Sequence, residues 1–331
     1  WRLMSNSKAT IYHVAKEAGV SIATVSRVLN FPLRVKPETR TAVMNAIDNL
    51  GYVPKAESRA RAFSETRRIG VLIPFFTTPS FVQRLRGISE VLNKHEYEMV
   101  IYPVDSKARE TSYLETLPMR ATLDGLIITS QVFDETIAQR LLNNHLETVV
   151  IEHRNPLFSS IEIDDVAGGV MAAEYLVKKG YQKIAFIGGK IKPEFGLDPI
   201  TKRLEGYRRV LEKNNILLPE DYISEYAFDP GKNLKKLIAF GTPLAIFAAT
   251  DMQAISLIRE ARVLGLRIPQ DVAIIGFDDI DMAEFFGLTT IHQPLDESGS
   301  IAANLLLSRL EDPSQPVQHV QLTLKVVERE T

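Results

Sequence analysis

The sequence contains no cysteine in its 331 residues. This absence excludes a disulfide framework, a thiol nucleophile and any metal site built on cysteine. Long apolar runs are also missing, since none approaches the roughly 18 residues that a membrane-spanning helix needs. The first residues, WRLMSNSK, lack the apolar core of a secretory signal peptide. We therefore expect no membrane span and a cytoplasmic protein.

Net charge is small as well, at −2, but its distribution is uneven. Residues 1–68 hold twelve Lys and Arg against five Asp and Glu, whereas the remainder holds 27 basic and 36 acidic residues. A basic amino-terminal part on an acidic body points that part towards a polyanion. The chain is too long to fold around a single hydrophobic core, so two or three domains are expected.

Residues 10–30, TIYHVAKEAGVSIATVSRVLN, predict two short helices joined by a tight turn. Gly19 can adopt the left-handed conformation that ends the first helix, and Ser21 can cap the second. The second helix would bury Val25, Val28 and Leu29 and turn Ile22, Ala23, Ser26 and Arg27 outward. An ordinary pair of surface helices has the same spacing, but the basic charge favours a helix-turn-helix that enters a DNA major groove.

A third helix is predicted over Pro37–Leu50, after a loop at 31–36. Proline suits its first turn, and Gly51 would end it, so three helices would form a small headpiece. The following segment, 55–68, carries five basic residues and almost no apolar face. We interpret it as a hinge that contacts DNA, with a solvated tether as the alternative.

From residue 69 to 279, short apolar strands alternate with amphipathic helices. This alternation predicts parallel doubly wound sheets, and its length suggests two of them. In such folds ligands bind at the carboxyl ends of the strands. Five pairs at predicted strand ends could converge on one cleft: Pro74-Phe75, Thr129-Ser130, His153-Arg154, Thr250-Asp251 and Asp278-Asp279.

Several segments closely resemble the lactose-repressor (LacI/GalR) family of bacterial transcription regulators, in collinear order from about residue 9 to 328. They are ATIYHVAKEAGVSIATVSRVLN (9–30), VKPETRTAVMNAIDNLGYVP (35–54), RRIGVLIP (67–74), IDDVAGGVMAAEYLVKKGYQKIAFIGG (163–189), RLEGY (203–207), FAATDMQAISLIREARVLGLRIPQDVAIIGFDD (247–279) and LTTIHQP (288–294). The resemblance implies a helix-turn-helix headpiece on a two-lobed α/β body like that of periplasmic sugar-binding proteins, with three strands crossing between the lobes.

By this resemblance, residues 1–54 form the headpiece and 55–68 the hinge helix or linker. Residues 69–331 form the effector-binding and dimerisation domain, with lobe 1 at about 69–165 and 294–320 and lobe 2 at about 166–293 and 321–331. The implied partners are double-stranded operator DNA, a small-molecule effector expected to be a sugar, and a second copy of the chain, with a tetramer left open. Effector binding would change the lobe angle and thereby operator affinity.

The resemblance places Ile22, Ala23 and Arg27 against base edges, where an arginine can contact guanine bidentately. Hydroxyls suited to phosphates are those of Thr10, Tyr12, Ser21, Thr24 and Ser26. In the hinge, the expected DNA contacts are Ala56, Arg59, Ala60 and Arg61. Arg61 stands where the family usually has a leucine that wedges into the minor groove, so the degree of DNA bending is in question.

In the body, the resemblance assigns effector contact to Phe81, Thr129, Asp164, Arg203, Asp251 and Asp278. Carboxylates, an arginine and an aromatic face together suit a polyol. Core packing would equally explain Phe81, an ion pair would explain Arg203, and lobe-hinge hydrogen bonds would explain Thr129 and Asp164. On the helix predicted at 80–94, Arg84, Arg86 and Lys94 are expected to be ordinary surface charges.

The sequence predicts no catalytic residue, metal site or cofactor. Gly188-Gly189-Lys190 lacks the spacing of a phosphate-binding loop, and Asp278, Asp279 and Asp281 lack the remaining ligands of a calcium loop. Two alternatives of another class stay open: a solute-binding protein without a DNA role, and an α/β enzyme acting on sugars. Within the main interpretation, a global carbon regulator that depends on a phosphoprotein corepressor is the other possibility.

Overall fold

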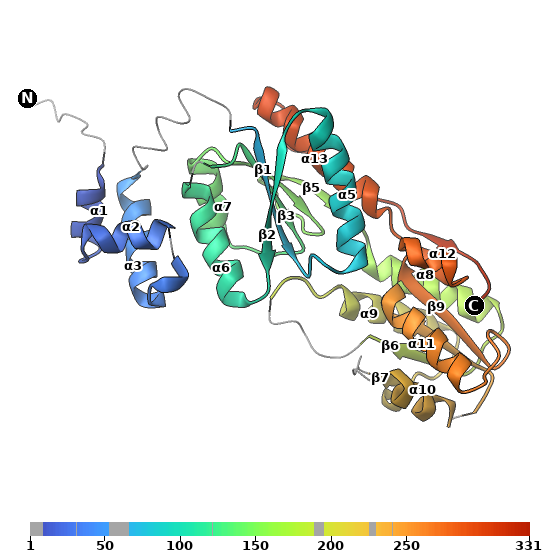
Figure 1. The fold of residues 1–331 in the computed structure, drawn as a ribbon. Helices are drawn as coiled ribbons and strands as arrows, with labels where there is room; N and C mark the ends of the chain where they lie inside the picture. Colours follow the sequence, from blue (N-terminus) through green and yellow to red (C-terminus); the bar gives the residue numbers. More distant parts are fainter. Residues whose placement is uncertain are drawn as a thin grey trace, which may run out of the picture.

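The computed structural model describes residues 9–30, 32–52, 66–120, 122–188, 195–224, 230–239 and 241–331. They form a small helical headpiece followed by a body of two α/β lobes (Figure 1). The predicted fold class is confirmed. None of the helices in these ranges has the length and apolar character needed to cross a membrane.

The headpiece consists of α1 (Ile11–Glu17), α2 (Ile22–Asn30), the 3₁₀ turn η1 (Pro32–Arg34) and α3 (Pro37–Leu50). Gly19 is left-handed, with φ of 64°, and the Ser21 hydroxyl accepts a hydrogen bond from the Thr24 amide at 3.2 Å. Both features match the prediction for the turn. The segment at 31–36, predicted as a loop, instead contains η1. Helix α3 has the predicted bounds and ends at the left-handed Gly51.

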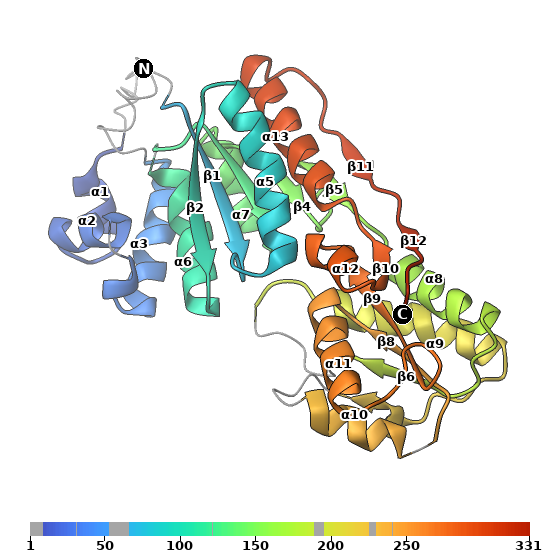
Figure 2. The same ribbon diagram turned by 45° about the vertical axis from the view of Figure 1, so that its right-hand side comes forward.

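Lobe 1 is built on a sheet in which every strand is parallel to its neighbours, in the order β11-β5-β4-β3-β1-β2. Helices α5 and α13 pack on one face of this sheet, and α6 and α7 pack on the other (Figures 1 and 2). The elements are β1 (Arg68–Pro74), α5 (Pro79–Lys94), β2 (Glu98–Val104), α6 (Lys107–Thr116), β3 (Gly125–Thr129), α7 (Glu135–Asn143), β4 (Glu147–Ile151), β5 (Ser159–Glu162), α13 (Leu295–Glu311) and β11 (His319–Gln321).

Lobe 2 repeats this plan with the strand order β12-β10-β9-β8-β6-β7, in which only β12 is antiparallel to its neighbour. Helices α8 and α9 cover one face, and α10 and α11 the other. The elements are α8 (Asp165–Lys178), β6 (Ile184–Ile187), α9 (Pro199–Lys213), β7 (Ile223–Ser224), α10 (Pro230–Ile238), β8 (Leu244–Ala248), α11 (Asp251–Val263), β9 (Val272–Asp278), α12 (Asp281–Phe285), β10 (Thr289–His292) and β12 (Lys325–Val327).

Two elements of the alternation are short. Strand β7 covers two residues, and 225–229 lie outside the described residues. Helix α6 ends at Thr116, where the 3₁₀ turn η2 (Leu117–Met119) follows with proline at its second position. The chain passes between the lobes three times, after β5, after β10 and between β11 and β12.

In each lobe, two helices cross at a pair of glycines. A Cβ atom built on Gly87 of α5 would lie 1.9 Å from the Asp296 carbonyl oxygen of α13, and one on Gly299 would lie 2.1 Å from that of Arg84. In lobe 2, a Cβ on Gly169 of α8 would lie 1.9 Å from the Arg203 carbonyl oxygen of α9. Only hydrogen at these positions permits such close backbone approach. Both crossings involve the backbone of an arginine.

The headpiece contacts lobe 1 through two ion pairs. Asp48 of α3 accepts hydrogen bonds from the Arg140 guanidinium of α7 at 2.6 and 2.8 Å, and Arg40 lies 2.8 Å from Glu115. Met119, which follows α6, packs into the apolar core of the headpiece. Where the chain enters lobe 1, the amides of Thr66 and Arg67 donate to the Asp124 carboxylate, each at 2.8 Å.

We predict that Gly169→Ala destabilises lobe 2, because the added methyl group must push α9 away from α8. The expected loss is about 1–3 kcal/mol of the apparent free energy of unfolding, as for other overpacked sites. Urea unfolding followed by circular dichroism measures it. Glu174→Ala, at an exposed position of the same helix, is the control and should stay within about 0.5 kcal/mol of the wild type. Equal unfolding curves for the two variants would show that the crossing tolerates a side chain.

Candidate functional site

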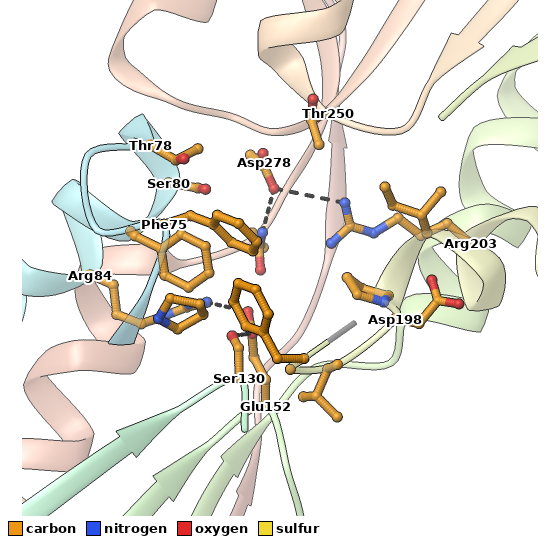
Figure 3. Close-up of a pocket in the computed structure, with 18 residues that line it drawn as sticks. Phe75, Thr78, Ser80, Arg84, Ser130, Glu152, Asp198, Arg203, Thr250 and Asp278 are labelled. Atoms are coloured by element: carbon orange, nitrogen blue, oxygen red, sulfur yellow. Dashed lines mark hydrogen bonds and ion pairs between the residues drawn. The ribbon is translucent and has the colours of Figure 1, made fainter. Parts of the chain in front are cut away.

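A cavity of about 330 Å³ lies between the two lobes, at the carboxyl ends of β1, β3, β4 and β9 (Figure 3). Both lobes contribute to its wall, as expected for a ligand site in this kind of fold. The lining residues are Pro74, Phe75, Thr78, Ser80, Phe81, Arg84, Ser130, Glu152, Phe195, Gly196, Leu197, Asp198, Pro199, Ile200, Arg203, Thr250, Asp278 and Gln293.

Aromatic rings close one side of the cavity. Phe75 of lobe 1 and Phe195 of lobe 2 stack with their ring centroids 5.4 Å apart and an interplanar angle of 27°. Next to them, the Leu197 amide of lobe 2 donates a hydrogen bond to the Ser130 carbonyl oxygen of lobe 1 at 3.1 Å. The lobes therefore touch across this side of the cavity.

Arg84 and Glu152 form the polar wall of lobe 1. The Arg84 guanidinium is buried and lies 2.6 Å from a Glu152 carboxylate oxygen, while its Nε donates to the Ser298 hydroxyl at 3.1 Å. The Ser130 hydroxyl donates to the other Glu152 oxygen. Burial alone would raise the pKa of Glu152, but the Arg84 charge and these hydrogen bonds hold that pKa below its ordinary value.

Arg203 and Asp278 form the polar wall of lobe 2. Arg203 lies over the Phe277 ring, donates to Asp165 at 2.9 Å and donates to the Ala249 carbonyl oxygen at 2.6 Å. Its distance to Asp278 is longer, at 4.0 Å, and Asp278 also accepts from the Gln293 side-chain amide. Burial raises the pKa of Asp278 to about 7, although the Arg203 charge acts in the opposite direction.

Four cavity residues, at the end of a strand or directly after one, have an unusual backbone conformation. Phe75, Ser130, Glu152 and Asp278 have φ angles of 45°, 54°, 68° and 126°, a range that side chains other than glycine rarely adopt. Each such residue costs about 1–3 kcal/mol, and the surrounding structure must hold it in place. Strained residues that converge on one cavity indicate a functional site.

Three of the six predicted effector residues line this cavity, namely Phe81, Arg203 and Asp278. Thr129 is fully buried within β3, and Asp164 caps α8 by accepting from the Ala167 amide at 2.9 Å. Asp251 lies behind the wall, where its oxygens accept from the Ile280 amide and the Thr290 hydroxyl at 2.9 and 2.5 Å. Burial raises the pKa of Asp251 to about 6.

The expected convergence of strand ends holds for Pro74, Phe75, Ser130, Thr250 and Asp278, which all line the cavity. The other five residues of the predicted pairs do not line it: Thr129, His153, Arg154, Asp251 and Asp279. The prediction that Arg84 is an ordinary surface charge was wrong, since it is 2% exposed and lines the wall. Sequence reasoning also missed Glu152, Phe195 and Gln293. Glu152 had a usable signal, because it directly follows the apolar strand β4.

A second contact between the lobes lies outside the cavity, on α5. The exposed Arg86 guanidinium bridges Asp296 of α13 and Asp281 of α12, with shortest distances of 2.7 Å to each. The neighbouring Gln83 side-chain oxygen accepts from the Asp281 amide at 2.9 Å. Since α12 belongs to lobe 2, these bonds join the lobes beside the cavity.

The predicted base-reading residues lie on the outer face of the headpiece. Ile22 is 39% exposed and Tyr12 is 69% exposed, while Ala23, Ser26 and Arg27 are exposed on the same helix as Ile22. The Ser21 and Thr24 hydroxyls are hydrogen-bonded to each other at 2.9 Å at the start of α2, and Thr10 precedes α1. The hinge residues Ala56, Arg59, Ala60 and Arg61 lie outside the described residues.

Across the described ranges, no group of three His, Asp or Glu side chains could hold a metal ion.

Comparisons with known proteins cover both parts of the chain. Residues 10–55 match the family described as bacterial regulatory proteins, lacI family, and residues 173–331 match a periplasmic binding protein-like domain. The catabolite control protein A of Priestia megaterium is 32% identical over 97% of this chain and 98% of its own length. The ribose operon repressor of Escherichia coli (strain K12) is 32% identical over 97% of this chain and 99% of its own.

A solved structure also matches along the whole length. The transcriptional regulator CelR in complex with cellobiose superposes with a TM-score of 0.69 at 27% identity, covering 97% of this chain and 99% of that one. The similarity therefore includes both the headpiece and the two-lobed body.

We predict that Asp278→Asn stabilises the protein more at pH 8 than at pH 5. A folded-state pKa raised to about 7 means that the folded protein binds this proton more tightly than the unfolded chain. The wild type therefore loses stability between about pH 4 and 7, a loss that asparagine avoids. The advantage of asparagine over aspartate should grow by about 2–3 kcal/mol from pH 5 to pH 8, since the folded-state pKa of Asp278 lies about two units above pH 5 and one unit corresponds to about 1.4 kcal/mol.

Urea unfolding at the two pH values measures this difference. Asp271→Asn is the control, because Asp271 stands just before the same strand and its bond to Arg267 lowers its pKa to about 2. That variant should show no pH-dependent gain between pH 5 and 8. A stability difference between Asp278→Asn and wild type that stays constant over this range would contradict the raised pKa.

Proposed function

The chain belongs to the lacI family of bacterial regulatory proteins and is a DNA-binding transcriptional regulator, and from this membership we propose that it represses transcription under control of a carbohydrate-like effector. The single observation that supports effector control best is the cavity between the lobes, lined by paired charges and aromatic rings. Operator DNA is its macromolecular partner, and we propose a cytoplasmic location for that reason.

The headpiece supports the choice of its DNA-reading residues. Helix α2 turns Ile22, Ala23 and Arg27 outward, and no other described element covers this face. We propose that Arg27 contacts a guanine and that Ile22 offers apolar contact, as to a thymine methyl group. Thr10, Tyr12, Ser21, Thr24 and Ser26 would contact phosphates, and the residues proposed for the hinge are Ala56, Arg59, Ala60 and Arg61.

A homodimer is the proposed assembly, because helix-turn-helix proteins of this kind read two half-sites with two copies. We propose that residues 1–54, 55–68 and 69–331 act as headpiece, hinge and effector-binding domain. A change in the angle between the lobes would then be transmitted to the headpiece through the segment that follows Tyr52 and through the Asp48–Arg140 contact. We assign no enzymatic step, since the related proteins named above are regulators.

For the effector, Phe81, Arg203 and Asp278 are the proposed contacts among the residues first identified from the sequence, and Glu152, Phe75 and Phe195 join them. Asp164 and Asp251 are hydrogen-bonded within the fold and Thr129 is buried in β3, so these three would act through the fold. The alternative of a phosphoprotein corepressor on α5 finds less support. Arg84 is buried there, and Arg86 is bound to two carboxylates.

We predict that Arg27→Ala weakens binding to a specific operator by about tenfold or more, but weakens binding to unrelated DNA much less. Loss of a bidentate base contact removes about 1–3 kcal/mol of discrimination. Fluorescence anisotropy at one salt concentration would compare an operator selected from random duplexes with a scrambled duplex. Lys16→Ala, an exposed basic residue of α1, is the control and should weaken both DNAs equally. If Arg27→Ala weakened binding to the operator and to the scrambled duplex equally, Arg27 would not take part in base recognition.

We predict that a sugar raises the thermal midpoint of the body, because a ligand that binds only the folded state stabilises it by RT ln(1 + [L]/Kd). A thermal-shift screen should include ribose and cellobiose, the first named in a relative and the second bound in the matching structure. Nucleobases serve as the comparison class. A shift with nucleobases alone would replace the carbohydrate effector by a heterocyclic one and leave the DNA role intact.

A further inference from the structure

We infer that the cavity selects an uncharged polyhydroxylated ligand and rejects its phosphorylated or carboxylated derivatives. This inference rests on the proposed function and narrows the class of effector. It follows from the way in which the cavity distributes charge between its two lobes, and from the lack of an uncommitted cation among the described residues that line it.

Both arginines of the cavity are already bound to protein groups. Arg84 is held by Glu152 and Ser298, and Arg203 is held by Asp165 and the Ala249 carbonyl oxygen. Among the described residues, Nη1 of Arg84 and Nη2 of Arg203 have no protein acceptor, so each guanidinium can still donate to a neutral hydroxyl oxygen. Neither has a net positive charge left to offer, because a carboxylate lies within 3 Å of it.

The remaining charge of the cavity is negative. Glu152, Asp198 and Asp278, the last of which ionises near neutral pH, line it against two arginines. Asp165 and Asp251 lie directly behind the wall. An anionic ligand would enter beside these carboxylates, and the described lining residues offer it no unpaired cation. Bringing like charges together away from bulk water is unfavourable, and proteins use such repulsion to exclude a competing ligand.

Helix amino termini are the other feature that could attract an anion. Helices α9 and α11 both begin at the cavity, and in each of them the cap side chain binds the amide of the third helical residue. Asp198 accepts from the Thr201 amide at 3.2 Å, and the Thr250 hydroxyl accepts from the Gln253 amide at 3.4 Å. Carboxylates stand at both of these ends, Asp198 as the cap of α9 and Asp251 as the first residue of α11, so neither end offers a free anion site.

A polyol would provide partners for the hydrogen-bonding groups of the cavity wall that have none among the described residues. Glu152 is ionised and can only accept hydrogen bonds, so it needs donors such as ligand hydroxyls. Asp278, with a pKa of about 7, can accept from a ligand hydroxyl when ionised and donate to one when protonated. Figure 3 shows these two side chains on opposite sides of the cavity, beside Phe75. The aromatic side formed by Phe75, Phe81 and Phe195 would cover the C–H face of a sugar ring. Hydroxyls towards the carboxylates and carbon towards the rings therefore give a consistent orientation.

The test compares matched pairs of ligands on the full chain. Ribose with ribose 5-phosphate, glucose with glucose 6-phosphate and galactose with galacturonate would be measured by thermal shift and calorimetry. We expect a neutral member to bind at least tenfold more tightly than its anionic derivative. An anionic member that binds as tightly as its neutral partner would overturn the inference. No binding by any pair, with operator binding intact, would overturn both this inference and the carbohydrate proposal.

Glu152→Gln provides a second readout that does not depend on absolute affinity. It removes one negative charge and releases Arg84, so the ratio of anionic to neutral affinity should rise by about tenfold. Glu205→Gln is the control, because Glu205 is an exposed partner of Arg209 on α9. Operator binding would show that each variant is folded. A ratio unchanged by Glu152→Gln would contradict the role given to the Arg84–Glu152 pair.

Discussion

Pairing of buried charge within each lobe is the constraint on which the cleft depends. Arg84 and Glu152 both belong to lobe 1, and Arg203 and Asp165 both belong to lobe 2. A buried charge that loses its partner is costly, often by several kcal/mol. Because neither pair spans the cleft, the lobes can separate without leaving such a charge behind. The contact of Arg86 with Asp281 does span it, but there both side chains are exposed and the bond is weak in water.

The glycine crossings place these arginines. In lobe 1, α5 and α13 approach so closely at Gly87 and Gly299 that the backbone of Arg84 is fixed against the opposite helix. In lobe 2, Gly169 does the same for Arg203. Burial of a side chain as long as arginine costs conformational entropy. A backbone that is already fixed leaves fewer side-chain conformations to be lost, so this cost is smaller. The same construction thus serves both walls of the cavity.

Local pattern was sufficient for much of the fold and for part of the site. Helix α3, the Ser21 cap and the alternation of strands follow from the periodicity and turn chemistry of neighbouring residues. Strand ends pointed to Phe75, Ser130 and Asp278. Arg84 could not be identified, since its burial depends on Glu152, which lies 68 positions further along the chain. Phe195 was missed for a similar reason, because it stands in a loop and meets Phe75 only when the lobes come together.

The three crossings between the lobes have a mechanical consequence. Two bodies joined by three short, neighbouring links can rotate about the line of those links, but they can neither slide nor twist freely. Under the proposed function, effector binding would therefore act mainly on the angle between the lobes. Asp124 binds the amides of Thr66 and Arg67, so the chain that enters β1 would move together with the lobe 1 sheet. A rotation of lobe 1 would thus change the direction of the chain at the start of β1.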